Sequence, residues 1–197
     1  MAEMLVYGSL EFGRVVKDLV GQCGHRFAGY IDDYNGGDEV LGGLAHVVEH
    51  FPPDRYQVAI AVGYRDLSAR WNVYQTVRSK GYGVPALVHP RAYVRDAGSV
   101  GDGALIMAGS VVDVHAVIAS LVVIWPGAVV NHDSVVHENT FLSPNSTVCG
   151  CAIVGRATFV GAGATIVDHV EVPPGSFIKA NAVFGGRTAA SPDPADR

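Results

Sequence analysis

The feature that most constrains this sequence is a six-residue period across its second half. Every sixth position from Val88 to Ile178 is valine, isoleucine or leucine, which makes sixteen aliphatic positions without exception. The position four residues further on is Ala, Gly, Ser or Thr in fourteen repeats and Val in two. An α-helix repeats every ~3.6 residues and a simple strand every ~2, so neither element explains the pattern. The period predicts a hexapeptide β-helix.

The third residue after each aliphatic one supports this prediction. A flat strand must turn a corner once per hexad, and corners favour residues that tolerate positive φ. Nine of these positions hold Gly, Asp or Asn: Gly103, Gly109, Gly127, Asp133, Asn139, Asn145, Gly163, Gly175 and Asn181. The pattern resembles the left-handed β-helix of hexapeptide-repeat transferases. That resemblance implies three hexads per coil, and hence a little over five coils between residues 88 and 183.

The first half lacks this period and favours alternating strands and helices. The expected strands are Leu5–Tyr7, Phe27–Ile31 and Val58–Val62, and the expected helices are Phe12–Val20 and Leu67–Ser79. This order predicts a small parallel sheet built from βαβ units. We therefore expect a mixed α/β, Rossmann-like domain over residues 1–84, a β-helix over 85–186 and a flexible tail over 187–197.

Composition excludes several classes of protein. The chain has 14 Lys and Arg against 19 Asp and Glu, a net charge of −5, so it lacks the basic excess that nucleic-acid binding requires. The longest apolar run, 116–130, is interrupted and too short for a membrane span. The first residues do not resemble a secretory signal, and three cysteines are too few for a disulfide framework. These observations favour a cytoplasmic protein.

Three segments of the first domain are candidates for ligand binding. The loop from Gly8 and Ser9 to Gly13 follows a strand and opens a helix, where phosphates commonly bind, but it is not a G-x-G-x-x-G motif. Asp32 and Asp33 end the second strand, where an acid often contacts a ribose. A solvated turn explains them equally well. Gly63 lies in a loop, and Arg70 lies one turn into the helix that follows it. This loop either lines a ligand-binding crevice together with the other two segments or forms an ordinary helix cap.

The β-helix brings titratable residues together because residues 18 apart stack along one edge. One predicted corner column is Ala97, His115, Asp133, Cys151 and His169, and the column beside it is Asp96, Val114, His132, Gly150 and Asp168. His132 suits a general base that Asp133 orients, although a polar corner also tolerates both residues. Cys151 is interpreted as a small corner residue. The spacing of His132 and His137 is similar to one in γ-class carbonic anhydrases, but Asp96 replaces a further histidine of that family.

Taken end to end, the chain resembles bacterial sugar O- and N-acyltransferases of the sialic-acid O-acetyltransferase group. The resemblance is greatest to those acting on nucleotide-linked 4-amino-4,6-dideoxysugars. The matching segments are 6–8 with 12–16, 29–33, 61–63 with Arg70, 88–92, 130–133 and 143–144. Two departures stand out. Phe141 replaces a second histidine of many relatives, and Lys179-Ala180-Asn181 replaces a Gly-Ala-Gly.

The resemblance implies an N-acetyltransferase that transfers acetyl from acetyl-CoA to the amine of a nucleotide-linked amino-deoxysugar. It implies a homotrimer without a metal, with His132 as base and Asp133 assisting it. It places the nucleotide-sugar on the first domain and CoA along Gly150, Ala162 and Ala180, with Lys179 near the phosphates. The alternatives are a sugar O-acetyltransferase, a γ-carbonic-anhydrase-like metal enzyme and a non-catalytic nucleotide-sugar binder.

Overall fold

The computed structural model describes residues 2–185, so the tail predicted over 187–197 lies outside the described residues. The first part is a four-stranded parallel sheet in the order β3-β2-β1-β4. Its strands are β1 (Glu3–Tyr7), β2 (Arg26–Ile31), β3 (Val40–Gly42) and β4 (Tyr56–Ile60). Its helices are α1 (Glu11–Gln22), α2 (Leu44–His50) and α3 (Leu67–Ser79), and a 3-10 turn, Tyr64–Asp66, precedes α3.

Burial explains why the predicted elements of this sheet form. Met4, Leu5 and Val6 of the inner strand β1 are fully buried because both faces of the sheet are covered. The strand and helix predictions are confirmed with small shifts of their ends, and α3 spans the residues expected for it. The sequence reading missed β3 and α2, which are the shortest strand and α-helix of this domain.

The second part is a β-helix whose two-residue strands stack into three parallel sheets. The first sheet contains β5 (Leu87–Val88), β7 (Leu105–Ile106), β10 (Val123–Ile124), β13 (Phe141–Leu142), β16 (Phe159–Val160) and β19 (Phe177–Ile178). The second contains β6 (Tyr93–Val94), β8 (Val111–Val112), β11 (Val129–Val130), β14 (Thr147–Val148), β17 (Thr165–Ile166) and β20 (Val183–Phe184). The third contains β9 (Val117–Ile118), β12 (Val135–Val136), β15 (Ile153–Val154) and β18 (Glu171–Val172). A 3-10 turn, Ala97–Ser99, precedes the bridge of Val100 to Ile118.

The hexapeptide prediction is confirmed residue by residue. The second residue of each strand from β5 to β19 is one of the periodic aliphatic positions, and in β20 it is Phe184. Together with alanines four places on, these residues form the core of the β-helix. All nine corner positions named above have positive φ, between 56° and 73°. Each strand pairs with the strand 18 residues away, as three hexads per coil require.

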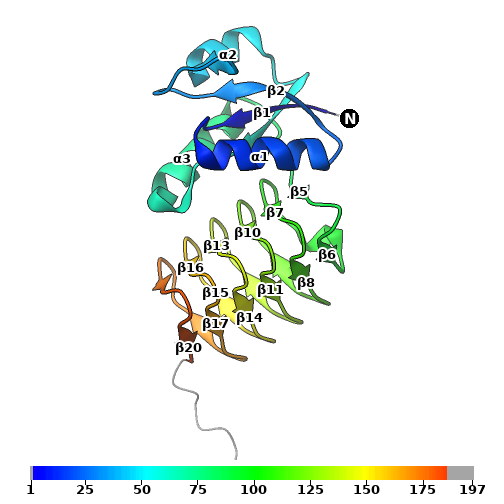
Figure 1. The fold of residues 1–197 in the computed structure, drawn as a ribbon, viewed down its shortest axis with the longest axis vertical. Coiled ribbons are helices and arrows are strands. Elements are labelled where there is room, and N and C mark those ends of the chain that lie inside the picture. The colour runs from blue at the N-terminus through cyan, green and yellow to red at the C-terminus, as the bar shows by residue number, and fades with distance from the viewer. Residues whose placement is uncertain (1, 186–197) are drawn as a thin grey trace, which may run out of the picture.

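The first domain lies on the first sheet of the β-helix (Figure 1). Outward-facing Leu105, Val123 and Phe141 of this sheet share a buried cluster with Val16 and Leu19 of α1. The corner between the second and third sheets consequently points away from the first domain. No helix within residues 2–185 is long and apolar enough to cross a membrane.

Candidate functional site

The predicted histidine and aspartate meet at the corner between the second and third sheets. The His132 Nδ1 lies 2.8 Å from Oδ2 of Asp133, and the other carboxylate oxygen lies 3.1 Å from Nδ1 of His115. Asp133 adopts the left-handed conformation, with φ of 57°, which Asp tolerates better than most residues. One carboxylate thus contacts histidines of two successive coils.

Gly150 makes room for the His132 ring. A Cβ atom at Gly150 would lie 2.7 Å from Nε2 of His132, closer than real Cβ atoms approach. The two residues are 18 apart, and the amide of Cys151 donates to the carbonyl of His132 at 3.0 Å. The predicted corner columns are confirmed here, and the ring of His132 lies over a backbone that carries no side chain.

This arrangement prepares His132 to accept a proton. Hydrogen bonds from His132 and His115 lower the pKa of Asp133, which therefore remains a carboxylate near neutral pH. A neutral His132 with its Nδ1 proton directed at Asp133 keeps a free lone pair on Nε2. Because His132 is exposed, a substrate can approach that nitrogen. The geometry suits a general base oriented by an acid.

Asp32 holds the edge of the first domain together. Its carboxylate accepts hydrogen bonds from the amide and hydroxyl of Ser9, at 3.0 and 2.6 Å, and from the amides of Tyr34 and Asn35. Burial alone would raise the pKa of Asp32, but these hydrogen bonds outweigh it and hold the pKa at about 2. The carboxylate therefore fixes the Ser9 loop against the loop that follows β2.

Asp33 engages different elements at the same edge. Its Oδ1 accepts the Leu44 amide at 2.8 Å and thereby caps the start of α2, and its Oδ2 accepts the Tyr7 hydroxyl. Burial and the bond to Asp33 raise the pKa of Tyr7.

Gly8 also belongs to this edge, and its φ of 105° suits glycine alone. A Cβ at Gly8 would lie 2.9 Å from the Ala61 carbonyl, so β4 and the Gly8 loop approach closely.

The prediction that Arg70 lines this crevice is wrong. Arg70 is fully buried and donates through Nη1 to the carbonyl of Leu121 and to Oδ1 of Asn139, at 2.9 Å for the latter. Asn139 in turn donates to the carbonyl of Leu67 at 2.6 Å. Arg70 therefore joins α3 to a corner of the β-helix, where no ligand reaches it. Gly63 lies directly before the 3-10 turn.

Phe141, which stands where many relatives have a histidine, packs beneath the first domain. It is buried, and its ring centroid lies 6.0 Å from that of Phe12 and 5.4 Å from that of Tyr64. Tyr64 follows β4 and is exposed, so this aromatic cluster reaches the surface at the loop after β4. The sequence reading assigned no role to Tyr64 or to His115. The predicted corner column, whose members are 18 residues apart, places His115 directly beside Asp133, and this spacing could have predicted their contact.

The residues expected to contact CoA lie on two edges of the β-helix. Gly150 is at the His132 corner, whereas Ala162, Lys179 and Ala180 are at the corner between the first and second sheets, and these three are exposed. Ala162 and Ala180 are separated by one coil and occupy equivalent positions of successive coils. The backbone amide of Asn181, next to Ala180, donates to the Ala162 carbonyl at 2.8 Å. One chain therefore does not gather the whole set into one cleft.

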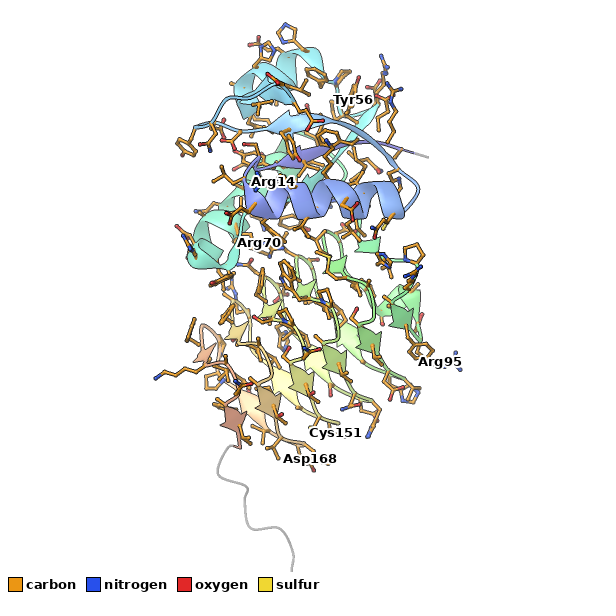
Figure 2. All side chains as sticks on the ribbon, in the orientation of Figure 1. Arg14, Tyr56, Arg70, Arg95, Cys151 and Asp168 are labelled. Carbon is orange, nitrogen blue, oxygen red and sulfur yellow. The ribbon has the colours of Figure 1, made fainter. Side chains whose placement is uncertain are left out.

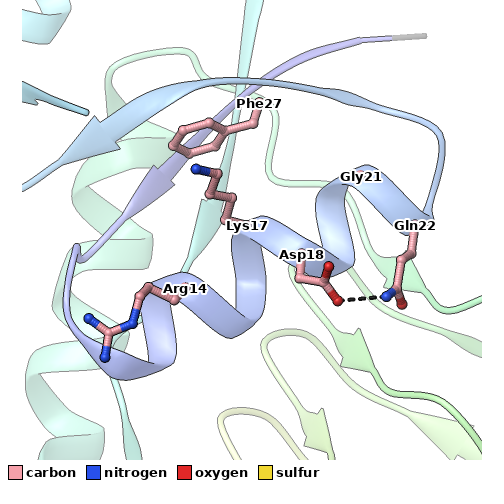
Figure 3. Close-up of a pocket in the computed structure, with 6 residues that line it drawn as sticks. All are labelled: Arg14, Lys17, Asp18, Gly21, Gln22 and Phe27. Atoms are coloured by element: carbon pink, nitrogen blue, oxygen red, sulfur yellow. Dashed lines mark hydrogen bonds between the residues drawn. The ribbon is translucent and has the colours of Figure 1, made fainter. Parts of the chain in front are cut away.

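A separate hollow of about 500 Å³ lies on the outer side of α1 (Figure 3). Arg14, Lys17, Asp18 and Phe27 are among the residues that line it, and it contains none of the predicted site residues. Lys17 already pairs with Glu39, and Asp18 accepts a hydrogen bond from the side-chain Nε2 of Gln22 at 2.6 Å. The polar groups of this hollow are thus largely engaged within the protein.

The two predicted half-sites are far apart within one chain. Figure 2 shows Cys151 and Asp168, neighbours of the His132 corner, on the edge of the β-helix remote from the first domain. The Asp32 and Asp33 edge belongs to that first domain. Any reaction that uses both half-sites therefore requires a second copy of the chain.

The fold and the His–Asp corner together define a two-domain protein of the left-handed β-helix class, with a Rossmann-like first domain. Residues 3–77 match the PglD N-terminal domain family. A comparison with curated proteins finds no significant match.

Solved structures match nearly the whole chain. The acetyltransferase domain of PglB from Neisseria gonorrhoeae is 26% identical with a TM-score of 0.85, covering 94% of this chain and 92% of that one. PerB from Caulobacter crescentus, solved with CoA and GDP-perosamine, is 25% identical with a TM-score of 0.85, covering 94% and 89%. These matches support the predicted resemblance to sugar acyltransferases of the sialic-acid O-acetyltransferase type.

Proposed function

We propose that this protein transfers the acetyl group of acetyl-CoA to the amine of a nucleotide-linked amino-deoxysugar. The observation that carries the proposal is the His132–Asp133 pair, placed at an exposed corner of a chain that matches acetyltransferases along nearly its full length. A histidine-to-alanine mutant of GDP-perosamine N-acetyltransferase from C. crescentus, solved with CoA and GDP-perosamine, matches with 25% identity and a TM-score of 0.85. These ligands of the relative support both proposed substrates.

The geometry assigns a limited task to the protein. A thioester is already activated, so the enzyme needs to hold the amine beside it and to remove one proton. The amine attacks the thioester carbon, Nε2 of His132 takes the amine proton, and the carbon–sulfur bond breaks. The CoA thiolate leaves and takes up a proton from the imidazolium to give free CoA and neutral His132. The Asp133 carboxylate stabilises the imidazolium that forms, as the acid does in other His–Asp pairs.

We propose a homotrimer whose active sites lie between neighbouring chains. The third sheet has an outward strip of apolar residues, Val117, Val135 and Ile153, which the first domain does not cover. Burying this strip against a neighbour gives a hydrophobic reason for assembly. The neighbour can supply the nucleotide-sugar edge, with Gly8, Ser9, Asp32, Asp33 and Gly63. It can also supply the edge with Ala162, Lys179 and Ala180 for CoA. We also propose that the protein works in the cytoplasm, because its proposed substrates are found there.

Release of free CoA thiol tests the proposal. The protein is incubated with acetyl-CoA and a panel of nucleotide-linked sugars, in which each amino-sugar is paired with its hydroxyl analogue. We expect thiol release with at least one amino-sugar and little with its analogue. Release only with hydroxyl compounds would establish O-acetylation instead. Tight binding of nucleotide-sugars without any release would identify a non-catalytic binder.

A further inference from the structure

His132 and Asp133 also belong to a group of three potential metal ligands, completed by Cys151. The ligand atoms of the three side chains all lie within 4.8 Å of one another. Asp133 and Cys151 occupy equivalent corner positions of adjacent coils, with φ of 57° and 58°. The Cys151 amide donates to the His132 carbonyl at 3.0 Å. Backbone hydrogen bonding therefore holds these side chains at one place, independently of any loop.

The chemistry of these ligands selects the cation. An imidazole nitrogen, a carboxylate oxygen and a thiolate sulfur are the ligands that zinc takes in proteins, whereas magnesium and calcium take oxygen ligands. Tetrahedral zinc with bonds of about 2.0–2.3 Å places its ligand atoms about 3.3–3.6 Å apart, which side-chain rotation can reach from the spacing here. His115 contacts the second oxygen of Asp133 at 3.1 Å and can orient the carboxylate.

We propose that His132, Asp133 and Cys151 bind Zn²⁺ with an open fourth position, and that the zinc-bound enzyme is inactive. Binding releases the Cys151 thiol proton to solvent and leaves a thiolate on the metal. It also removes the base. A neutral imidazole has one lone-pair nitrogen, so once zinc occupies that nitrogen the other carries the proton and accepts nothing. The inactivation rests on the proposed acetyl transfer, whereas the binding does not.

Cobalt(II) is the spectroscopic probe for the binding step, used with the full chain free of any polyhistidine tag. A cobalt–thiolate bond gives a charge-transfer absorption in the near ultraviolet that imidazole and carboxylate ligands do not give. We expect this band to saturate at one cobalt per chain and to disappear when zinc displaces the cobalt. The competition also measures the zinc Kd.

Cysteine variants show which thiol is responsible. Cys151→Ser should lose the band and weaken zinc binding at least about ten-fold. Cys149→Ser is the matched control and should keep both, because Cys149 is not among the side chains whose ligand atoms lie within 4.8 Å of one another at this corner. Cys151→Gly gives a second test that should fold at least as well, since glycine tolerates the φ of 58°. No band in the wild type, or a band lost only with Cys149, overturns the proposed site.

The consequence for activity is measured separately, by thiol release in the presence of buffered zinc. Zinc should inhibit the wild type and Cys149→Ser, and a chelator should restore their rates. The zinc concentration that halves the rate, relative to each protein's own zinc-free rate, should rise at least about ten-fold in Cys151→Ser. Zinc that binds through Cys151 without lowering the rate overturns the inactivation. A cobalt band in a protein without transferase activity contradicts only the proposed function.

Discussion

At the scale of single residues, the proposed active site depends on a corner position that has two requirements. The corner needs a residue that tolerates positive φ, and the base needs a carboxylate beside Nδ1 of His132. Asp133 meets both, with φ of 57° and a contact of 2.8 Å. Gly150 then leaves the space that the His132 ring occupies. A regular repeat can therefore carry a reactive site without departing from its backbone geometry.

His132→Ala should lower turnover by roughly 10²–10⁴, as loss of a positioned general base does, while the fold persists because the ring is exposed. Steady-state thiol release, with circular dichroism as a check on folding, measures this. His137→Ala is the matched control and should change turnover little. Equal losses in both variants, with activity restored by added zinc, would instead support a catalytic metal and a γ-carbonic-anhydrase-like site.

Asp32 should make the stability of the first domain depend on pH in the acid range. The group has a pKa of about 2 when folded and 3.8 as its ordinary value, so its contribution is present above about pH 4 and disappears as the pH falls through 2. The shift corresponds to about 2 kcal/mol of unfolding free energy. Urea unfolding of the wild type and Asp32→Asn between pH 2 and 7 should show a difference that shrinks below pH 4. A difference that is constant over this range would contradict the assignment.

Some residue roles could not be predicted because they depend on contacts distant in sequence. His132 and Asp133 followed from the 18-residue column alone. Arg70 appeared to line the crevice because it lies one turn beyond the Gly63 loop. Its actual partners, Leu121 and Asn139, lie 51 and 69 residues away in the other domain. Local spacing contains no information about such a pairing.

At the scale of elements, α3 is attached to the β-helix by a buried polar network. Arg70 bonds Asn139, and Asn139 bonds back to the carbonyl of Leu67 at the start of α3. The remaining Nε and Nη2 of Arg70 have no partner within the described residues, and burial lowers the pKa of Arg70 to about 9. The network orients α3 but retains a desolvated cation, so polar pairing and desolvation oppose each other there.

Arg70→Ala should reduce the unfolding free energy by about 2–4 kcal/mol, because it leaves two buried acceptors with fewer donors and opens a cavity. Arg70→Met should cost less, since it keeps most of the volume and removes the buried charge. Arg78→Ala on the same helix is the control. Its ion pair with Asp102 is about half exposed, so the change should stay within about 1 kcal/mol. Denaturant unfolding compares the three, and a smaller effect at Arg70 than at Arg78 would contradict a structural role for the network.

The same scale explains which elements the sequence predicted. The hexads were recognisable because sixteen repeats of one local rule leave little ambiguity. β3 and α2 were missed because each is short and flanked by glycines, at Gly36-Gly37 and Gly42-Gly43. β3 forms by pairing with β2, and the Asp33 carboxylate caps the start of α2. Both elements depend on tertiary contacts more than on their own pattern.

At the scale of the whole molecule, the docking of the two domains separates the proposed half-sites. Apolar side chains of α1 cover the first sheet, and the His132 corner lies opposite that sheet. The proposed nucleotide-sugar edge of one chain therefore lies too far from the proposed base of the same chain to act with it. In a cyclic trimer each base can meet the first domain of a neighbour, and all three sites are equivalent.

This arrangement predicts complementation between two impaired variants. His132→Ala lacks the base. Asp33→Ala should lose nucleotide-sugar affinity by about 10- to 150-fold while retaining CoA affinity, which calorimetry can verify. When equal amounts are mixed, unfolded and refolded together, a site works only if its base comes from an Asp33→Ala chain and its first domain from a His132→Ala chain. Random assembly makes that pairing about one time in four, so activity should recover to about a quarter of the wild-type value. At a nucleotide-sugar concentration far below saturation, each variant refolded alone should stay well below that value. A mixture as inactive as its components, with mixed trimers confirmed by mass spectrometry, would show that each active site draws both halves from one chain.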